Sequence, residues 1–169
     1  MKVVCAWCKG ELGSKAEDSD ALGGYAVSHG LCDTCARHLM AQAGMPLEQY
    51  LNGLEAPVAV VGPTGLVQTA NAKARAMLGK EIGQISGLPG GDVFECEYAL
   101  LPEGCGNTVH CTACTIRNTV MDSFQTGVTH VHVSARLNQM TPSGPQVVAL
   151  SISTERVGDV VLLRIDQIG

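Results

Sequence analysis

Residues 57–71, PVAVVGPTGLVQTAN, carry the pattern that decides the fold. Residues 58–61 are rich in valine, residues 66–70 form a second apolar run, and Gly-Pro-Thr-Gly lies between them. Such runs around a glycine–proline turn predict two paired strands. Asn71 is a good helix-capping residue, and the stretch 72–78 ends at a glycine, which is a usual helix stop. The sequence therefore predicts a β-hairpin followed directly by a short helix.

The remainder of this region extends the pattern to a complete sheet. Residues 129–138 alternate between apolar and polar, and residues 146–156 and 159–168 form two further apolar runs around a turn. An amphipathic helix is predicted over residues 115–125. The order is strand, strand, helix, irregular middle, helix and three strands. It predicts an α+β domain over residues 56–169, with a five-stranded antiparallel sheet and helices on one face.

This order resembles that of a PAS domain. The residues that carry the resemblance are 57–71, together with the three closing strands, and the match covers about two thirds of the chain. The resemblance implies a sensory fold whose sheet and helices enclose a pocket for a cofactor or small ligand. A fold does not name its ligand, so the chemistry must come from the residues of the site.

The composition excludes several classes of function. The chain has 169 residues, a net charge of −5 and no run of Lys or Arg, which argues against a nucleic-acid-binding surface. No apolar stretch approaches the roughly 20 residues of a membrane span, and Lys9 comes too early for a signal peptide. We therefore expect a cytoplasmic protein without membrane contact. In that compartment its eight cysteines are more typical of metal binding or catalysis than of disulfides.

The first four cysteines predict a zinc finger. They form two CxxC pairs, namely Cys5 with Cys8 and Cys32 with Cys35. The first pair suits a tight knuckle and the second begins a predicted helix that ends at Gly44, which resembles a treble-clef zinc finger. A domain over residues 1–44 buries little core, so zinc would supply the missing folding free energy. His29 is the one plausible substitute ligand.

A linker helix is predicted over residues 45–55. Its apolar residues Leu47, Tyr50, Leu51 and Leu54 fall on one helical stripe. The stripe either docks on the second domain, which we favour, or pairs with a second copy of the chain. A homodimer through this stripe is a further prediction.

The second four cysteines lie where a PAS domain keeps its pocket-lining loop and long helix. Cys96, Cys105, Cys111 and Cys114 have the spacing C-x8-C-x5-C-x2-C, and the last two lie at a predicted helix start, which stabilises thiolates. The segment is similar to a cysteine-bearing insertion of some bacterial sensory PAS proteins. No proven cofactor follows from that likeness.

Four thiolates suit either zinc or an iron–sulfur cluster. A structural zinc is superfluous in a domain that already has a core, and the flanking Gly104 and Gly106 allow backbone N–H groups to approach sulfur. These points favour a cluster, although the spacing matches neither ferredoxin pattern. A second zinc, a disulfide or free thiols stay open. We assign His110, beside Cys111, a supporting or surface role.

Two other histidines fall two residues apart in the strand predicted over 129–138. Strand alternation would place His130 and His132 on one face, together with Val128 and Ser134. We expect a solvent-facing pair.

These features predict a signal-sensing module rather than an enzyme. Its second cysteine quartet would respond to redox state, oxygen or nitric oxide. The change would pass through the helix at 115–125, the sheet and the linker. We expect no output domain after the last strand, so the signal would reach a separate downstream signalling protein, or else this chain is a portion of a longer sensor. The alternative is a structural interaction module in which both quartets hold zinc. A dithiol oxidoreductase is a third possibility, but the βαβ surroundings typical of such motifs are missing from the pattern.

Overall fold

The computed structural model describes residues 2–5, 8–14, 27–30, 44 and 47–169. It divides the chain into two compact units, Met1–Leu47 and Glu48–Gly169. The predicted zinc ligands Cys32 and Cys35 lie outside the described residues, as does most of the helix predicted to follow them. No helix in the described part of the chain is long and apolar enough to cross a membrane.

The described residues of the first unit form three short strands, β1 (Lys2–Cys5), β2 (Glu11–Ser14) and β3 (Val27–Gly30). β1 is central, because it pairs antiparallel with β2 and parallel with β3. In this register Cys5 is the partner of Gly30. The end of β1, which carries the first predicted zinc ligand, therefore lies beside the end of β3.

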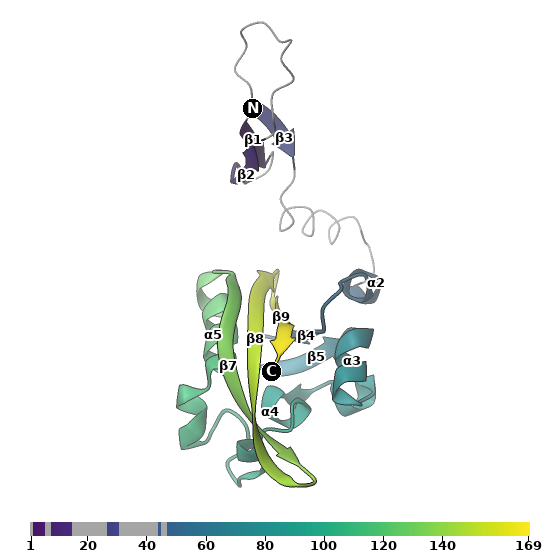
Figure 1. Ribbon diagram of the computed structural model, residues 1–169, viewed down its shortest axis with the longest axis vertical. Coiled ribbons are helices and arrows are strands. Elements are labelled where there is room, and N and C mark those ends of the chain that lie inside the picture. Colours follow the sequence, from purple (N-terminus) through teal and green to yellow (C-terminus); the bar gives the residue numbers. More distant parts are fainter. Residues whose placement is uncertain (1, 6–7, 15–26, 31–43, 45–46) are drawn as a thin grey trace, which may run out of the picture. The chain divides into compact units, whose positions relative to one another are not determined.

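The second unit is an antiparallel sheet with helices packed on it (Figure 1). Its strands run in the order β6-β5-β4-β9-β8-β7. The strands are β4 (Val58–Val61), β5 (Leu66–Ala70), β6 (Leu88–Pro89), β7 (His130–Thr141), β8 (Gly144–Val157) and β9 (Val160–Ile168). The helices are α2 (Leu47–Asn52), α3 (Ala72–Leu78), α4 (Gly90–Val93) and α5 (Thr115–Thr126), with short 3-10 helices η1 (Ile82–Gln84), η2 (Glu97–Leu100) and η3 (Val109–Ala113).

The α+β element order predicted from the sequence is present, but the sheet has six strands rather than five. The additional strand is β6, whose two residues pair with β5. Two residues, one of them a proline, are too few to show the alternation by which strands are recognised in a sequence. The prediction was therefore wrong in its strand count and right in the order of the longer elements.

Asn71 joins the β4–β5 hairpin to α3 and is almost fully buried. Its Oδ1 accepts hydrogen bonds from the N–H groups of Val58 at 3.0 Å and Ala74 at 2.9 Å. Its Nδ2 donates to the carbonyl oxygens of Leu51 at 3.0 Å and Ala56 at 2.9 Å. The predicted helix cap is thus also the hydrogen-bonding centre that ties α2, β4 and α3 together.

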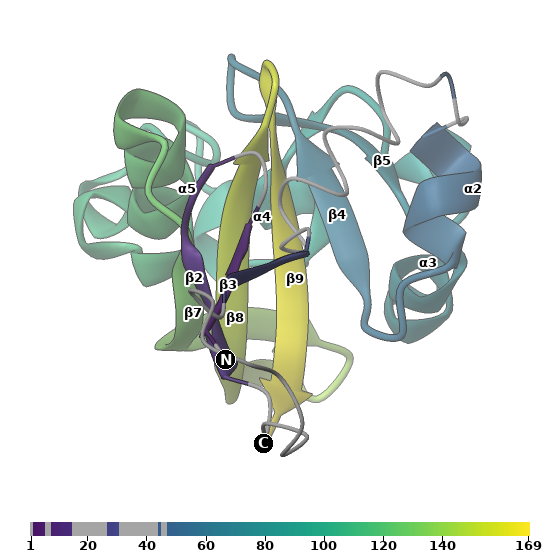
Figure 2. The same cartoon turned by 90° about the horizontal axis from the view of Figure 1, so that it is seen from above.

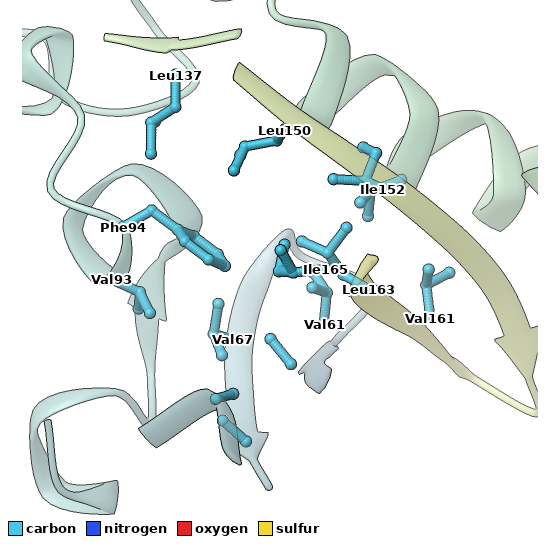
Figure 3. Packing of buried hydrophobic residues seen from close by; sticks show 14 of the residues in the cluster. Val61, Val67, Val93, Phe94, Leu137, Leu150, Ile152, Val161, Leu163 and Ile165 are labelled. Carbon is cyan, nitrogen blue, oxygen red and sulfur yellow. The ribbon is translucent and has the colours of Figure 1, made fainter. Parts of the chain in front are cut away.

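The main core lies on one face of the sheet, under α3, α4 and α5. In β4 the residues alternate, because Ala59 and Val61 belong to this core whereas Val58 and Val60 face the other way. Side chains from β4, β5, α4, β7, β8 and β9 gather in it, as Figure 3 shows for Val61, Val67, Phe94, Ile152 and Leu163. α5 packs on β7, β8 and β9, while α3 packs on β4 (Figure 2).

The opposite face of the sheet is covered by α2. Leu51 is only 1% exposed and packs with Val58, Val60 and Leu162, which form a second apolar cluster. Tyr50 and Leu54 are half-buried against the same cluster. The predicted stripe therefore packs against the chain's own sheet. α2 corresponds to the predicted linker helix, and it covers apolar strand residues that lie outside the core under α3, α4 and α5.

β7 departs from the predicted alternation near its start. A β-bulge lies between His130 and Val133, and His132 adopts a left-handed φ of 53°. The expected solvent-facing pair of histidines is therefore split. His130 Nε2 lies 2.7 Å from Oδ2 of Asp122 on α5, and His132 Nδ1 lies 3.4 Å from Oδ2 of Asp166 on β9. An extra residue in one strand reverses the faces of the side chains that follow it. No pattern in the sequence predicted this bulge.

Candidate functional site

The second cysteine quartet comes from two segments of the chain. Cys96 follows α4 and is the N-cap of η2, and it forms an isolated bridge with Gln139 of β7. Cys105 lies after η2, Cys111 lies within η3, and Cys114 is the N-cap of α5. The first of these cysteines is therefore attached to the sheet, and the last begins the longest helix of the unit.

The two segments bring all four thiols to one cavity of about 800 Å³. Its apolar wall includes Phe94, Val120 and Leu163, which also belong to the buried core. The four cysteines are free thiols, with no disulfide among them. The predicted quartet is thus brought together over the core of the second unit, on a cavity shared by the sheet and α5.

Three of the four sulfurs accept a hydrogen bond from the backbone. The N–H donors are those of Gly91 to Cys105 at 3.2 Å, Gly106 to Cys111 at 3.1 Å, and Arg117 to Cys114 at 3.5 Å. Donors aimed at sulfur favour the negatively charged thiolate over the thiol. They are also one of the means by which proteins set the potential of iron–sulfur clusters. The backbone therefore places N–H donors at three of the four sulfurs of the quartet.

The thiols also influence one another electrostatically. Burial raises the pKa of Cys96 above its ordinary value, backbone N–H groups oppose that rise, and the neighbouring charges of Cys114 and Cys111 add to it. Burial likewise raises the pKa of Cys105, to which the charges of Cys111 and Cys96 contribute. Several thiolates cannot share such a site without a compensating positive charge. A bound cation or cationic cluster would provide it.

Cys111 has the opposite shift. Burial again acts to raise its pKa, but the Thr108 hydroxyl, the N–H groups of Thr108 and Gly106 and the charge of Arg117 together lower it. The Thr108 Oγ1 lies 3.2 Å from the Cys111 Sγ. In the metal-free chain Cys111 is therefore the thiol whose anionic form is best stabilised among those with a shifted pKa.

Gly91 makes room for Cys105. A Cβ placed on Gly91 would lie 2.7 Å from the Sγ of Cys105 and 2.9 Å from its Cβ, whereas a Cβ on the adjacent Gly90 would meet nothing within 4 Å. Close backbone approach to sulfur was expected at Gly104 and Gly106. Gly106 does donate its N–H to a sulfur. The role of Gly91 was missed, although the Gly-Gly pair at 90–91 was the sequence signal that could have indicated it.

Two aromatic rings connect the two cysteine-bearing segments. The rings of Tyr98 and His110 stack with their centroids 3.9 Å apart and their planes 10° from parallel. Asn138 of β7 donates from Nδ2 to the Tyr98 hydroxyl at 2.6 Å. His110 thus has a supporting contact, as expected, whereas the parts of Tyr98 and Asn138 were missed because residues 40 apart show no pattern in a sequence.

The chemistry of this donor set fits a thiolate-bound centre, since four thiols line one cavity and three of them accept backbone N–H bonds. Among the described residues, no three Cys, His, Asp or Glu side chains form a group that could hold one metal ion.

The described half of the first quartet is a tight turn. Cys5 is buried and donates its N–H to the carbonyl of Gly10 at 2.8 Å, and Lys9 donates its N–H to the carbonyl of Cys5 at 2.9 Å. Lys9 has a left-handed φ of 63°, and Cys8 is exposed. The turn fits the knuckle expected of Cys5 and Cys8. The four-ligand zinc site stays a prediction, since the other pair lies outside the described residues.

No protein-family model matches the chain, and no curated protein matches it in sequence. Solved structures that match include a LOV protein from Rhodobacter sphaeroides, with 14% identity and a TM-score of 0.49 over 77% of this chain and 66% of that one. The PAS domain of an HTR-like protein from Haloarcula marismortui matches with 13% identity and a TM-score of 0.46, over 79% of this chain and 98% of that domain.

The photoactive yellow protein domain of the sensor histidine kinase Ppr from Rhodospirillum centenum matches with 16% identity and a TM-score of 0.43, over 74% of this chain and 96% of that domain. The chain spans just under two thirds of the length of the LOV protein. Identities and TM-scores this low assign the chain no family, activity or ligand.

Proposed function

We propose that the second unit is a PAS-like sensory module whose four cysteines hold an iron–sulfur cluster. The cluster would respond to redox state, oxygen or nitric oxide. The observation that carries this proposal is the placement of Cys96, Cys105, Cys111 and Cys114 on one cavity, with backbone N–H donors at three of the four sulfurs. The role is one of sensing rather than catalysis.

Two features favour a cluster over zinc at this site. The unit has its own apolar core, so a metal is not needed to hold it together. The N–H groups of Gly91 and Gly106 approach sulfur closely, as is useful where cluster potential must be set. Neither of these features is required by a closed structural zinc site.

The chain's own residues would have distinct parts in holding the centre. The four cysteines would be its ligands, and the backbone donors would stabilise their charge. The side-chain charge of Arg117 would partly offset the negative charge of Cys111. Gly91 would let Cys105 approach α4. When bound, a low-potential cluster supplies one-electron chemistry and reactivity toward oxygen and nitric oxide.

The first unit would be a structural zinc finger bound through Cys5, Cys8, Cys32 and Cys35. The tight turn between Cys5 and Gly10 supports this assignment, because a knuckle presents two sulfurs to one ion. The pairing of Cys5 with Gly30 adds support, since Gly30 precedes Cys32 by two residues in the sequence. The finger would be folded by its metal and would not sense.

The signal would pass to a separate downstream protein in the cytoplasm. Cys96 is attached to β7 and Cys114 begins α5, so a change at the centre acts on both the sheet and a helix. A homodimer stays a prediction. Leu51 is buried against the chain's own sheet, so a dimer contact would have to use other residues than the centre of the α2 stripe.

The alternative function is a structural interaction module in which both quartets hold zinc. The observation that favours it is Cys114, which caps α5 three residues after Cys111, since a CxxC at a helix start is common in zinc sites. This module would have a fixed metal and no response to oxidants.

The two functions differ in what the purified protein contains. We expect protein isolated without oxygen to be brown, to contain iron and acid-labile sulfide, and to lose its visible absorption on exposure to oxygen or nitric oxide. Colourless protein with zinc in both quartets would overturn the sensor and support the alternative.

A further inference from the structure

The connection between the two cysteine-bearing segments does not depend on a metal. Tyr98 follows Cys96 by two residues, and His110 directly precedes Cys111. Their rings stack at a centroid distance of 3.9 Å, so the segment of Cys96 is joined to the segment of the other three cysteines. We refer to this stacked pair as the Tyr98–His110 clasp.

The clasp is itself anchored to the sheet. Asn138 donates to the Tyr98 hydroxyl at 2.6 Å, and the next residues of β7 hold the start of the same segment. The Met140 N–H donates to the carbonyl of Glu95 at 2.7 Å, and Cys96 pairs with Gln139. The segment of Cys96 is therefore fixed to β7, whereas η3, which carries Cys111, reaches it through His110.

The other contacts of the second segment are mostly local. Cys111 accepts from Gly106 and lies beside Thr108, both within five residues of it in sequence. Gly91, which donates to Cys105, provides one bond between the segments. The stack is a second, and it is formed by the residue next to Cys111 in the sequence. Without it, η3 would keep its internal bonds and lose a principal tie to the segment of Cys96.

We propose that Tyr98 and His110 are positioning residues that hold the thiols of Cys96 and Cys111 around the cavity when no metal is bound. This inference rests on the proposed function for its purpose, since a centre that is gained and lost needs its ligands kept in place. Its structural content does not depend on which metal binds. Aromatic stacking beyond its buried area changes an equilibrium by about two- to tenfold.

The test measures how readily a short probe bridges Cys96 and Cys111 in the metal-free full-length chain. The probe carries two alkyl halides, and each thiolate displaces one of them. In a Cys105→Ser, Cys114→Ser background these two thiols are the only ones between Lys80 and Arg117. Trypsin releases that stretch as one peptide because it contains no internal Lys or Arg, so its mass distinguishes one bridge from two separate adducts.

His110→Ala is expected to lower the bridged fraction by about two- to tenfold. His110→Phe keeps an aromatic ring and should restore the bridge. Tyr98→Phe keeps the stack but removes the hydrogen bond from Asn138. Its bridged fraction should lie between that of the background protein, in which Tyr98 and His110 are unchanged, and that of His110→Ala. His110 is exposed, and unchanged circular dichroism will show that the variants fold.

Equal bridging in His110→Ala and His110→Phe would overturn the clasp. Iron release to a chelator, measured without oxygen in the four-cysteine chain, is the second readout and should be faster in His110→Ala than in His110→Phe. If His110→Ala loses bridging but the four-cysteine chain never contains iron or sulfide, the clasp is supported and the cluster is rejected. Bound iron and sulfide with unchanged bridging and release would keep the cluster and reject the clasp.

Discussion

The two cysteine quartets lie in units of opposite physical character. The first unit shows three strands of four residues each in its described part, whereas the second buries an apolar cluster drawn from most of its strands and from α3, α4 and α5. Under the proposed function, the cysteines would therefore have different roles in the two units. Zinc would supply folding free energy to the small first unit, whereas the second unit has its own core, so its four thiols call for a chemical explanation.

The largest contrast is expected when metal is removed. A chelator, or Cys5→Ser, should unfold the first unit, because structural zinc contributes about 10 kcal/mol or more to small fingers. The second unit should stay folded when metal is removed from its own four cysteines. Hydrogen exchange read separately for the two units measures this. Loss of protection in the strands of the second unit on chelation would break the comparison.

The second unit should instead depend on Asn71. Asn71→Ala leaves the N–H groups of Val58 and Ala74 and the carbonyls of Leu51 and Ala56 without their partner. Because each buried unsatisfied group costs about 1–3 kcal/mol, we expect the free energy of unfolding to fall by about 3 kcal/mol or more. Denaturant unfolding of the second unit measures it.

Asn52→Ala is the matched control for Asn71→Ala. Asn52 also accepts a bond from the N-terminus of α3, through the Ala72 N–H at 2.8 Å, but it is exposed. Water can replace it, so its loss should cost about 1 kcal/mol or less. Similar losses in the two variants would show that the second unit does not rest on this buried hydrogen-bonding centre.

A smaller difference in stability and metal retention is expected between alanine substitutions at the two adjacent glycines of α4. Gly91→Ala places a methyl group 2.7 Å from the Cys105 Sγ and should cost about 1–3 kcal/mol while weakening metal retention. Gly90→Ala meets open space and should change neither. Stability and metal content of the two variants, measured side by side, test this. Full metal retention in Gly91→Ala would argue against Cys105 as a ligand.

The smallest effect concerns the pH dependence of the metal-free thiols. The thiolate is the reactive form, so a lower pKa moves alkylation to lower pH. The pKa of Cys111 is lowered, chiefly by the Thr108 hydroxyl acting against burial, whereas burial raises the pKa of Cys105. Cys111 should therefore react at lower pH than Cys105, and Thr108→Val should move Cys111 to higher pH. Mass spectrometry of the peptides alkylated at a series of pH values measures both reactions. Alkylation of Cys111 and Cys105 with the same pH dependence would contradict the lower pKa of Cys111.

Local patterns in the sequence predicted the elements that depend on neighbouring residues. α3 begins after Asn71 and ends before Gly79, which has a left-handed φ of 64°, as capping chemistry requires. Cys114 caps α5 with its sulfur, at the helix start predicted from the sequence. These features are local, so a sequence read in short windows contains them.

Features set by distant partners were missed or wrong. The bulge at His132 and the short strand β6 depend on which strands lie alongside, and neither has a local signature. Tyr98 meets His110 only because η2 and η3 fold over one cavity. The cysteine spacing predicted that a site exists, but its supporting contacts became visible only in three dimensions.

Metal and acid-labile sulfide analysis of anaerobically purified wild type and Cys111→Ser, compared side by side, tests the central claim most directly. We expect the wild type to contain zinc together with iron and sulfide, and Cys111→Ser to lose the iron and sulfide but keep the zinc. A wild type with zinc for both quartets and no sulfide would contradict it.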